Sequence, residues 1–362
     1  MRILHVAPFY EPAWAYGGMV RSSAALCRAL ARRGHEVTVV TARLDPASAR
    51  EEKRDEVRVL RFAGPDFLKA RLVPWASGLR AFLGREIGSF DLAHLHGHRN
   101  GLAITAARAF RASRRPYVLM PHGTYPAHGQ YPRTKAVFDR LFGHAIVQGA
   151  AAVLAVSDRE AGDLPRPARV IPNGVEPCGT APPASPGPRP RLLFVGTDRP
   201  QKRGNLLREV MAALPAVDLH LAGPFGPGFL QAFGAAAGRV TACGVLAGDA
   251  LAAQYASADV VVHPAVGEAF GLVPFEAALA GTAAVVAGGH GCGEWFARAG
   301  GCVVRPDDPG ALIAAVRLRL EDPERARAEA RAVADFARRH LTWDAAAAAV
   351  ECVYAEVLGA RA

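Results

Sequence analysis

Two glutamates eight positions apart, Glu268 and Glu276, are the groups in this sequence best suited to binding a sugar. They stand on either side of a turn that contains Gly271. A helix is predicted just after this turn, so the free amides of Gly271 and Leu272 would lie at the positive end of its dipole, and the glycine would leave room for a phosphate. Carboxylates accept hydrogen bonds from hydroxyl groups such as those of a ribose or a hexose. Acids on both sides of a phosphate pocket therefore predict a sugar–phosphate–sugar ligand, which is a nucleotide sugar.

A strand and a helix must hold this turn in place. The valines from Val260 to Val262 form a short apolar run that stops near Pro264, which is typical of a buried parallel strand. Pro274 fits the first turn of a helix, because the amide that proline lacks would have no partner there. Many doubly wound proteins contain such turns, however. In the alternative interpretation Glu276 is an ordinary first-turn acid and Glu268 is a solvated loop residue.

The composition predicts a folded protein of two domains. With 362 residues the chain is long enough for two α/β domains, and 51% hydrophobic and 21% charged residues exclude a disordered chain. No apolar run reaches the ~20 residues that span a bilayer, and the N-terminus has no cleavage site typical of a signal peptide. Six cysteines without a CxxC pair favour a reducing compartment and argue against a zinc site or a disulfide framework. We therefore expect a cytoplasmic protein.

The net charge of +10 has two interpretations. Arginines cluster in two places, at Arg28, Arg32 and Arg33 and at Arg108, Arg111, Arg114 and Arg115. In one interpretation these clusters make a peripheral contact with anionic lipid headgroups at the inner membrane face, where a lipid-linked acceptor would lie. In the other they are a solvated face that attracts an anionic donor. Nucleic acid is not expected as a partner, because basic and aromatic residues do not interleave and no binding motif is present.

Strands and helices alternate along the chain, which predicts two doubly wound parallel sheets, an α/β class. We expect a first domain over residues 1–176, a linker over 177–190 with six prolines, a second domain over 191–341 and a C-terminal helix within 342–362. Strands are predicted at 2–7, 37–41, 57–62, 91–98, 117–125 with its exit loop, 151–157, 191–196, 217–223, 239–244 and 260–262. A single amphipathic helix is predicted from 132 to 149, and a helical stretch is predicted to end near Leu83.

Histidines gather at the ends of two predicted strands. His94, His96 and His98 alternate along residues 91–98, which places them on one strand face and raises the question of a metal site. No carboxylate or cysteine joins them in the sequence, so we interpret them as polar strand ends that face a cleft. His122 follows another strand at its carboxyl end, where ligands bind in open α/β sheets.

The string HPAVGEAFGLVPFEA, from His263 to Ala277, resembles the signature of retaining glycosyltransferases of family 4. Four further strings are similar to the same family: PAWAYGGMVR, PHGTY, VIPNGVE and VRPDDPGAL. The resemblance covers almost the whole chain. It implies the GT-B architecture, in which two Rossmann-like domains face a cleft, and a C-terminal helix that starts near Trp343 and returns to the first domain.

The family resemblance implies a role for each motif. Glu268 would contact hydroxyls of the donor sugar, Glu276 the ribose diol, and the backbone from Phe270 to Leu272 the distal phosphate or the sugar. His122 would lie near the donor sugar, and the paired glycines Gly17 and Gly18 would lie near the donor phosphates. On the acceptor side the candidates are His96 and Tyr16, in a mouth to which Phe9, Tyr10 and Trp14 also contribute.

The loop after residue 196 carries the expected phosphate-binding cation, Lys202. The family usually has an arginine directly after the glycine, but here Thr197 stands at that position. Arg199 or Arg203 would then supply the second charge. Positive charge is needed because negative charge develops on the leaving diphosphate in the transition state. The resemblance implies no metal ion and no cofactor beyond the nucleotide-sugar donor.

These features predict a retaining transferase that moves a hexose or an N-acetylhexosamine to a hydroxyl of a glycan, a lipid-linked or a small-molecule acceptor. Uridine is the first expectation for the donor base and guanosine, as in GDP-mannose, the second. Two alternatives remain open, a nucleotide-sugar epimerase of the same fold and a non-catalytic protein that binds sugar nucleotides. We expect a monomer or a homodimer.

Overall fold

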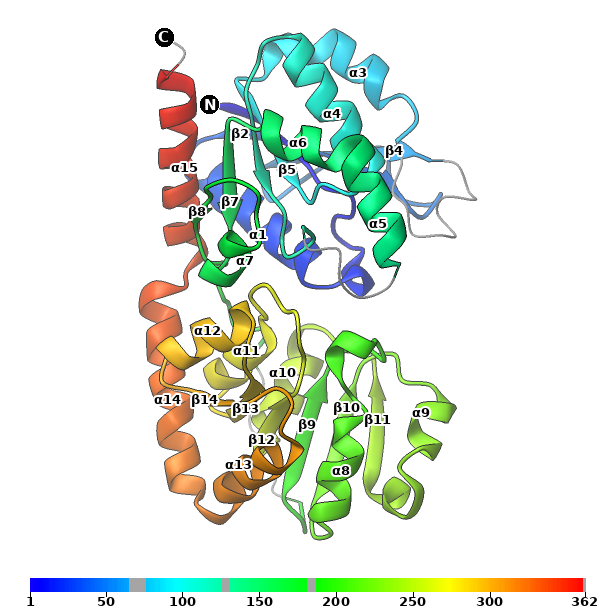
Figure 1. The fold of residues 1–362 in the computed structure, drawn as a ribbon, viewed down its shortest axis with the longest axis vertical. Coiled ribbons are helices and arrows are strands. Elements are labelled where there is room, and N and C mark those ends of the chain that lie inside the picture. The colour runs from blue at the N-terminus through cyan, green and yellow to red at the C-terminus, as the bar shows by residue number, and fades with distance from the viewer. Residues whose placement is uncertain (65–75, 126–130, 181–186, 361–362) are drawn as a thin grey trace. The chain divides into compact units, whose positions relative to one another are not determined.

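The computed structural model describes residues 1–64, 76–125, 131–180 and 187–360 (Figure 1). The chain divides into two compact units. Unit 1 comprises Met1–Gly174 together with Trp343–Ala362, and unit 2 comprises Val175–Thr342. The predicted α/β class is confirmed, since each unit is built on one sheet of mainly parallel strands. Among the described helices, none has both the length and the apolar composition that a membrane crossing requires.

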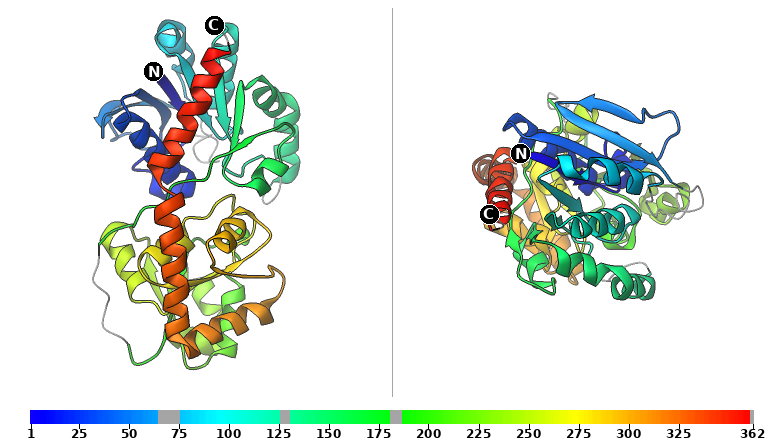
Figure 2. Two further views of the ribbon diagram at one scale, coloured as in Figure 1. Left: turned by 90° about the vertical axis from the view of Figure 1, so that its left-hand side faces the viewer. Right: turned by 90° about the horizontal axis from the view of Figure 1, so that it is seen from above.

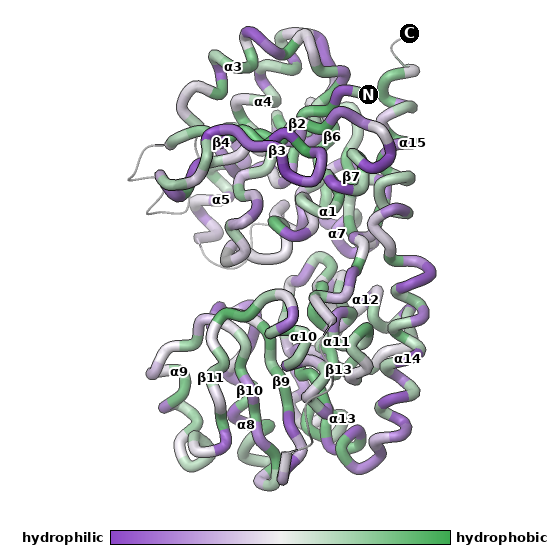
Figure 3. Tube along the Cα trace, turned by 180° about the vertical axis from the view of Figure 1, so that it is seen from behind, coloured by the Kyte–Doolittle hydropathy of each residue, from purple (hydrophilic) through white to green (hydrophobic). Residues whose placement is uncertain are grey.

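The sheet of unit 1 has eight strands in its described part, in the order β3-β4-β2-β1-β5-β6-β7-β8. Their bounds are β1 Arg2–Val6, β2 Glu36–Arg43, β3 Glu51–Arg54, β4 Val57–Ala63, β5 Leu92–His96, β6 Tyr117–Met120, β7 Ala152–Ala155 and β8 Arg169–Val170. The antiparallel edge strand β3 was not predicted, because its sequence EEKR is hydrophilic throughout (Figure 3). An edge strand needs no apolar alternation when water covers it.

The helices of unit 1 lie against its sheet, and most of them alternate with its strands along the chain (Figures 1 and 2). Their bounds are α1 Gly18–Arg32, α3 Leu79–Glu86, α4 Gly101–Ala112, α5 Pro132–Phe138, α6 His144–Gly149, α7 Asp158–Gly162 and α15 Trp343–Gly359, with 3-10 turns at Trp14–Tyr16 and Ile87–Ser89. The single helix predicted over 132–149 is wrong in one respect, since a π-helical turn at Asp139–Gly143 separates α5 from α6. The stretch predicted before Leu83 lies partly in 65–75, outside the described residues.

The C-terminal helix α15 packs against α1 within unit 1 (Figure 2). Its Val350 and Val353 are buried, and ion pairs join Arg33 to Glu351 and Arg32 to Asp344. The apolar side that the sequence predicts on this helix is therefore the side that faces the core.

The sheet of unit 2 is entirely parallel in its described part, with the order β11-β10-β9-β12-β13-β14. The strands are β9 Arg191–Val195, β10 Asp218–Ala222, β11 Val240–Gly244, β12 Val260–His263, β13 Ala283–Ala287 and β14 Cys302–Val304. The helices are α8 Leu206–Ala213, α9 Pro227–Gln231, α10 Gly248–Ala256, α11 Val273–Leu279, α12 Gly291–Arg298, α13 Pro309–Glu321 and α14 Pro323–His340, with 3-10 turns at Pro200–Lys202 and Gly234–Arg239. The strand order reverses at the neighbouring pair β9 and β12, so their carboxyl ends form the switch point at which such sheets bind ligands.

Candidate functional site

The predicted cation and the first predicted acid meet at the switch point of unit 2. Lys202 closes the 3-10 turn that follows β9, and Glu268 lies in the loop that follows β12. The ammonium Nζ of Lys202 donates a hydrogen bond to Oε1 of Glu268. The two side chains are 24% and 20% exposed, so the pair is partly buried but still reached by solvent. Neighbouring parallel strands thus bring together two charges that are 66 residues apart in the sequence.

The charge of Glu268 depends on this lysine. Burial acts to raise the pKa of the Glu268 carboxyl, but the Lys202 ammonium and its hydrogen bond outweigh burial and hold that pKa at about 2. Glu268 is therefore a carboxylate over the whole physiological pH range. It can accept hydrogen bonds from hydroxyl groups, and Lys202 retains further N–H donors for a ligand.

Backbone conformation and packing both require glycine at position 271. Its φ of +73° lies in the left-handed region, and a Cβ added there would lie 2.5 Å from Sγ of Cys292. The Cβ direction of this glycine is thus filled by Cys292 on α12, so no other residue fits there, and the approach of a phosphate to its amide stays a prediction. Phe270 is buried and stacks on Phe275 at 5.5 Å, so the turn is a packed element.

Glu276 lies in the first turn of α11, as predicted, and is 5% exposed. The hydroxyl of Tyr255 on α10 donates a hydrogen bond of 2.8 Å to Oε2 of Glu276. The helix α11 has seven residues, so its dipole is small and the helix-end argument made from the sequence is weaker than expected. The charge of Lys202 is the stronger electrostatic feature of this edge. The contacts predicted for Glu276, Gly271 and Leu272 with a nucleotide remain predictions.

The two candidate replacements for the missing arginine differ in their surroundings. Arg203 donates hydrogen bonds to the carbonyl of Pro306 and, at 3.4 Å, to Asp307, so it ties its loop to the start of α13. Arg199 is exposed, and in the described part of the chain its side chain forms no hydrogen bond or ion pair. Of the two, Arg199 is the one whose guanidinium is available to a ligand.

Sequence reasoning missed His263, which ends β12 beside the loop of Glu268. It is 1% exposed, and neither ring nitrogen has a hydrogen-bond partner among the described residues. Burial lowers the pKa of His263 to about 3, so the ring is neutral. In the sequence His263 marks the end of a strand before a proline. Nothing in the sequence shows that its buried ring nitrogens lack hydrogen-bond partners within the described structure.

In unit 1 the predicted histidine, His122, occupies a constrained position after β6. Its φ of +54° is left-handed, which is uncommon for a residue with a side chain. The loop is held from two sides, because Glu160 accepts hydrogen bonds from the amides of Gly123 and Val156, and Arg99 donates to the carbonyl of Thr124. Such strain is typical of a functional position.

His96 is fully buried, which corrects the expectation that it contacts an acceptor. Its Nδ1 lies 2.9 Å from Nε2 of His122 and its Nε2 lies 2.9 Å from Nδ1 of His5, so both ring nitrogens are engaged inside the protein. His98 lies beyond the end of β5 and bonds at 3.2 Å to Asp139. A carboxylate does therefore join one of the three histidines, from a position 41 residues later that the sequence could not reveal.

Three buried histidines, His5, His94 and His96, place ring nitrogens within 4.8 Å of one another. Their rings are stacked, with interplanar angles of 23° for His5 against either neighbour and 8° between His94 and His96. A metal binds imidazole in the plane of the ring, along the nitrogen lone pair. The lone pairs of this group are partly used within the protein, because Nδ1 of His5 is hydrogen-bonded to Nε2 of His96 and Nδ1 of His94 is hydrogen-bonded to the hydroxyl of Tyr354.

Gly17 and Gly18 begin α1, as predicted from the sequence. Gly17 is the N-cap with a φ of +91°, and no side chain caps the helix. No heavy atom lies within 4 Å of a Cβ added at either glycine, so within the described structure the helix start is open. Nearby, Tyr16 stacks on Phe9 at 4.0 Å, whereas Tyr10 is 3% exposed and belongs to the core, which corrects its assignment to an acceptor mouth.

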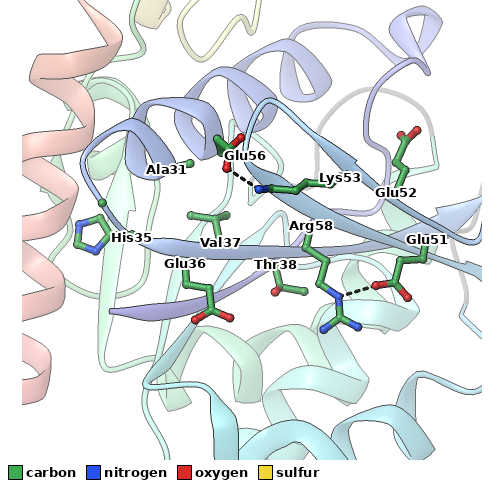
Figure 4. A pocket seen from close by; sticks show the side chains of 11 residues that line it. Ala31, His35, Glu36, Val37, Thr38, Glu51, Glu52, Lys53, Glu56 and Arg58 are labelled. Atoms are coloured by element: carbon green, nitrogen blue, oxygen red, sulfur yellow. Dashed lines mark hydrogen bonds and ion pairs between the residues drawn. The ribbon is translucent and has the colours of Figure 1, made fainter.

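A pocket of about 620 Å³ lies elsewhere on unit 1, between the amino-terminal part of β2, the end of α1 and the β3–β4 hairpin (Figure 4). Its charged side chains are largely paired, Lys53 with Glu56 and Arg58 with Glu51. None of the predicted site residues lines it. The carboxyl ends of the strands, which carry the predicted residues, lie at the opposite edge of the sheet.

Two family models match this chain. One described as Glycosyltransferase Family 4 matches residues 16–177, and one described as Glycosyl transferases group 1 matches residues 189–322. A D-inositol 3-phosphate glycosyltransferase of Xylanimonas cellulosilytica is 30% identical over 424 residues, which cover 100% of this chain and 97% of the relative. This chain belongs to glycosyltransferase family 4. It is thus a retaining glycosyltransferase that uses a nucleotide sugar, as the sequence predicts.

Solved structures extend the similarity to the fold. Sucrose-phosphate synthase of Thermosynechococcus elongatus has a TM-score of 0.81 and 24% identity, over 99% of both chains. Anabaena HepE in complex with UDP and glucose has a TM-score of 0.73 and 17% identity, over 98% of this chain and 100% of that one. The chain of this family 4 enzyme therefore has the predicted GT-B fold.

Proposed function

We propose that this enzyme transfers a hexose or an N-acetylhexosamine from a UDP-sugar to a hydroxyl acceptor, with retention of the anomeric configuration. The observation that carries the proposal is the Lys202–Glu268 pair at the switch point of unit 2, where a cation and a carboxylate stand side by side. Uridine is preferred because a structural relative, Anabaena HepE, is solved with UDP and with UDP-glucose. GDP-mannose is the second candidate donor.

Each residue of unit 2 has a role that fits its chemistry. Lys202 and the unpaired Arg199 offset the charge that develops on the leaving diphosphate, which lowers the barrier because this charge is greatest in the transition state. Glu268 accepts hydrogen bonds from hydroxyls of the donor sugar, and Glu276 from the ribose diol. The backbone from Phe270 to Leu272 approaches the distal phosphate or the sugar. Arg203 supports the loop through its hydrogen bond to Pro306.

The reaction needs no protein nucleophile in this proposal. The acceptor hydroxyl attacks on the face from which the diphosphate leaves, the bond from the anomeric carbon to the phosphate oxygen breaks, and the leaving phosphate takes the proton of the hydroxyl. In unit 1, His122 contacts the donor sugar, and Gly17 and Gly18 lie near the diphosphate and the acceptor. Tyr16 lies on the acceptor side.

The cations of the protein replace a metal ion in this proposal. Transfer should therefore continue at an unchanged rate after the protein is treated with EDTA and assayed in chelated buffer. Activity that disappears on chelation and returns with Mg²⁺ or Mn²⁺ would show that Lys202 and Arg199 are not sufficient.

Donor and acceptor panels test the proposal directly. Purified protein is incubated with UDP-glucose, UDP-N-acetylglucosamine, UDP-galactose and GDP-mannose, each with and without an acceptor, and released diphosphate is measured. The acceptors include an inositol phosphate, because the relatives at about 30% identity are named D-inositol 3-phosphate glycosyltransferases. The proposal predicts diphosphate release that depends on the acceptor. An epimerase would convert a donor without any acceptor, and a binding protein would release nothing.

A lipid-linked acceptor is favoured by one surface of unit 1, which we call the α5 patch and which comprises Tyr131, Arg133, Val137, Arg140 and Leu141. Its three apolar side chains are 74%, 58% and 63% exposed, and both arginines are exposed. Val137 lies near the end of α5, and Leu141 lies in the π-helical turn that follows it. Exposed apolar groups beside arginines fit the interface of an anionic bilayer.

Vesicle co-sedimentation tests this contact. Vesicles that contain phosphatidylglycerol should sediment the wild-type protein at low salt, and vesicles of phosphatidylcholine alone should not. Val137→Ser combined with Leu141→Ser should weaken sedimentation, whereas Val245→Ser, which changes an equally exposed apolar residue of unit 2, should not. Equal sedimentation of both variants would refute a lipid contact through the α5 patch.

A further inference from the structure

A file of hydrogen-bonded histidines leads from the predicted site residue His122 into the core of unit 1. Nε2 of His122 lies 2.9 Å from Nδ1 of His96, and Nε2 of His96 lies 2.9 Å from Nδ1 of His5. The three residues come from the β6 exit, from β5 and from β1, which are neighbours in the sheet. Successive ring centroids lie 5.2 Å apart, and the interplanar angles are 23° and 20°. We call these three residues the histidine file.

The inner end of the histidine file is sealed. His5 and His96 are fully buried, and Nε2 of His5 has no hydrogen-bond partner among the described residues. The outer end is His122, which is half-buried and makes no other side-chain hydrogen bond within the described ranges. Burial lowers the pKa of all three rings, to about 3 for His5 and about 4 for His122, so each is neutral at physiological pH.

A neutral imidazole carries one N–H donor and one bare nitrogen, so the file can be protonated in only two ways. In the inward arrangement His122 donates to His96 and His96 donates to His5. The proton of His5 is then on Nε2, and this buried N–H has no acceptor in the described part of the chain. In the outward arrangement His5 donates from Nδ1 to His96, and His96 donates from Nδ1 to Nε2 of His122. Nε2 of His5 then carries only a lone pair. Buried N–H groups without an acceptor are rarer than buried acceptors without a donor, so the outward direction is favoured.

We propose that His5 and His96 are positioning residues that keep the proton of His122 on Nδ1, so that His122 donates a hydrogen bond to an oxygen of the donor sugar. This inference rests on the proposed function for its ligand, but not for the tautomer itself. Since Nε2 of His122 accepts the hydrogen bond from His96, that nitrogen cannot also act as a base. His122 is then a fixed hydrogen-bond donor, and its task is to orient the sugar.

Three variants separate this role from simple packing. His96→Phe keeps a ring in the stack but removes both hydrogen bonds of the file. His96→Gln supplies an amide whose oxygen accepts from His5 and whose nitrogen donates to His122, which reproduces the outward direction. His94→Phe is the matched control, because His94 is equally buried and stacks on His96 at 4.5 Å but bonds to Tyr354 outside the file.

The tautomer is measured on the whole protein with 15N-labelled histidine. Long-range proton–nitrogen correlation spectra distinguish a protonated from a bare ring nitrogen, and His122→Asn identifies the signals of His122. Wild type, His96→Gln and His94→Phe should show His122 protonated on Nδ1, and His96→Phe should move a large share of that proton to Nε2. Protonation on Nε2 in the wild type, or an unchanged tautomer in His96→Phe, would overturn the proposal.

Turnover supplies the second readout. His96→Phe should lower kcat for sugar transfer roughly tenfold while UDP binds with unchanged affinity, and His96→Gln should restore most of that loss. If His94→Phe lowers kcat as much as His96→Phe does, the file acts only through packing and the proposal fails. The spectra require no donor, so a protein that shows the expected tautomer but turns over no nucleotide sugar would contradict the proposed function and leave the tautomer assignment standing.

Discussion

Removal of the Lys202 ammonium should destabilise the protein by an amount that depends on pH. The pKa of the Glu268 carboxyl is held at about 2 against an ordinary value of 4.5. A difference of about 2.5 at 1.36 kcal/mol for each pKa unit corresponds to about 3 kcal/mol of stabilisation at neutral pH. In Lys202→Met the aliphatic stem remains but the charge is lost, so most of this stabilisation should be lost with it.

The sign of the pH dependence follows from the direction of the shift. Because the folded pKa lies below the unfolded one, the stabilisation is fully present above about pH 4.5 and is lost as the pH falls towards 2. Urea unfolding of wild type and Lys202→Met should therefore differ by about 3 kcal/mol at pH 7 and by clearly less at pH 3. The same comparison with Glu268→Gln and with the double variant gives the coupling energy of the pair. Additive single effects, or a stability difference that is the same at pH 7 and pH 3, would show that the Lys202–Glu268 pair does not stabilise the fold.

Three further predictions concern unit 2. Glu276→Gln should weaken UDP binding by about 1–3 kcal/mol in calorimetry while the melting temperature without ligand changes little, since the buried shape is kept. Gly271→Ala should destabilise the protein by about 2 kcal/mol, because the φ of +73° is costly for alanine and the new methyl meets Cys292, and a melting temperature equal to wild type would contradict this. His263→Leu should raise stability by about 1 kcal/mol in urea unfolding, because two orphaned polar atoms are removed, and a loss of stability would show that the ring has a partner.

Much of the fold is predictable because apolar runs mark buried parallel strands. The runs at Ile3, Val37 and Val260 all become central strands, and the helix start at Pro274 is confirmed within one residue. The edge strand β3 could not be predicted in this way, because its residues are all hydrophilic and show no alternation of apolar and polar side chains. The π-helical turn at Asp139–Gly143 could not be predicted, because apolar spacing does not reveal one extra residue in a helical turn.

The candidate site was predictable as a set of residues but not as an arrangement. Family resemblance marks Lys202 and Glu268, yet their ion pair follows only from the pairing of β9 with β12. Likewise, the histidine file depends on sheet register, which sets His5 opposite His94 and aligns the neighbouring strand ends. Contacts across 91 residues of sequence, as between His5 and His96, have no local signal.

Calorimetric titration with UDP measures the proposed contact between Lys202 and the diphosphate of the donor. Wild type should bind UDP, and Lys202→Met should bind it at least about tenfold more weakly, because the phosphates lose a charged hydrogen bond. Arg203→Met, which removes a neighbouring cation that is bound to Pro306, should bind UDP nearly as tightly as wild type. Equal UDP affinity in wild type and Lys202→Met would show that Lys202 does not bind the phosphates, and no binding of UDP or GDP by the wild type would show that unit 2 has no nucleotide site.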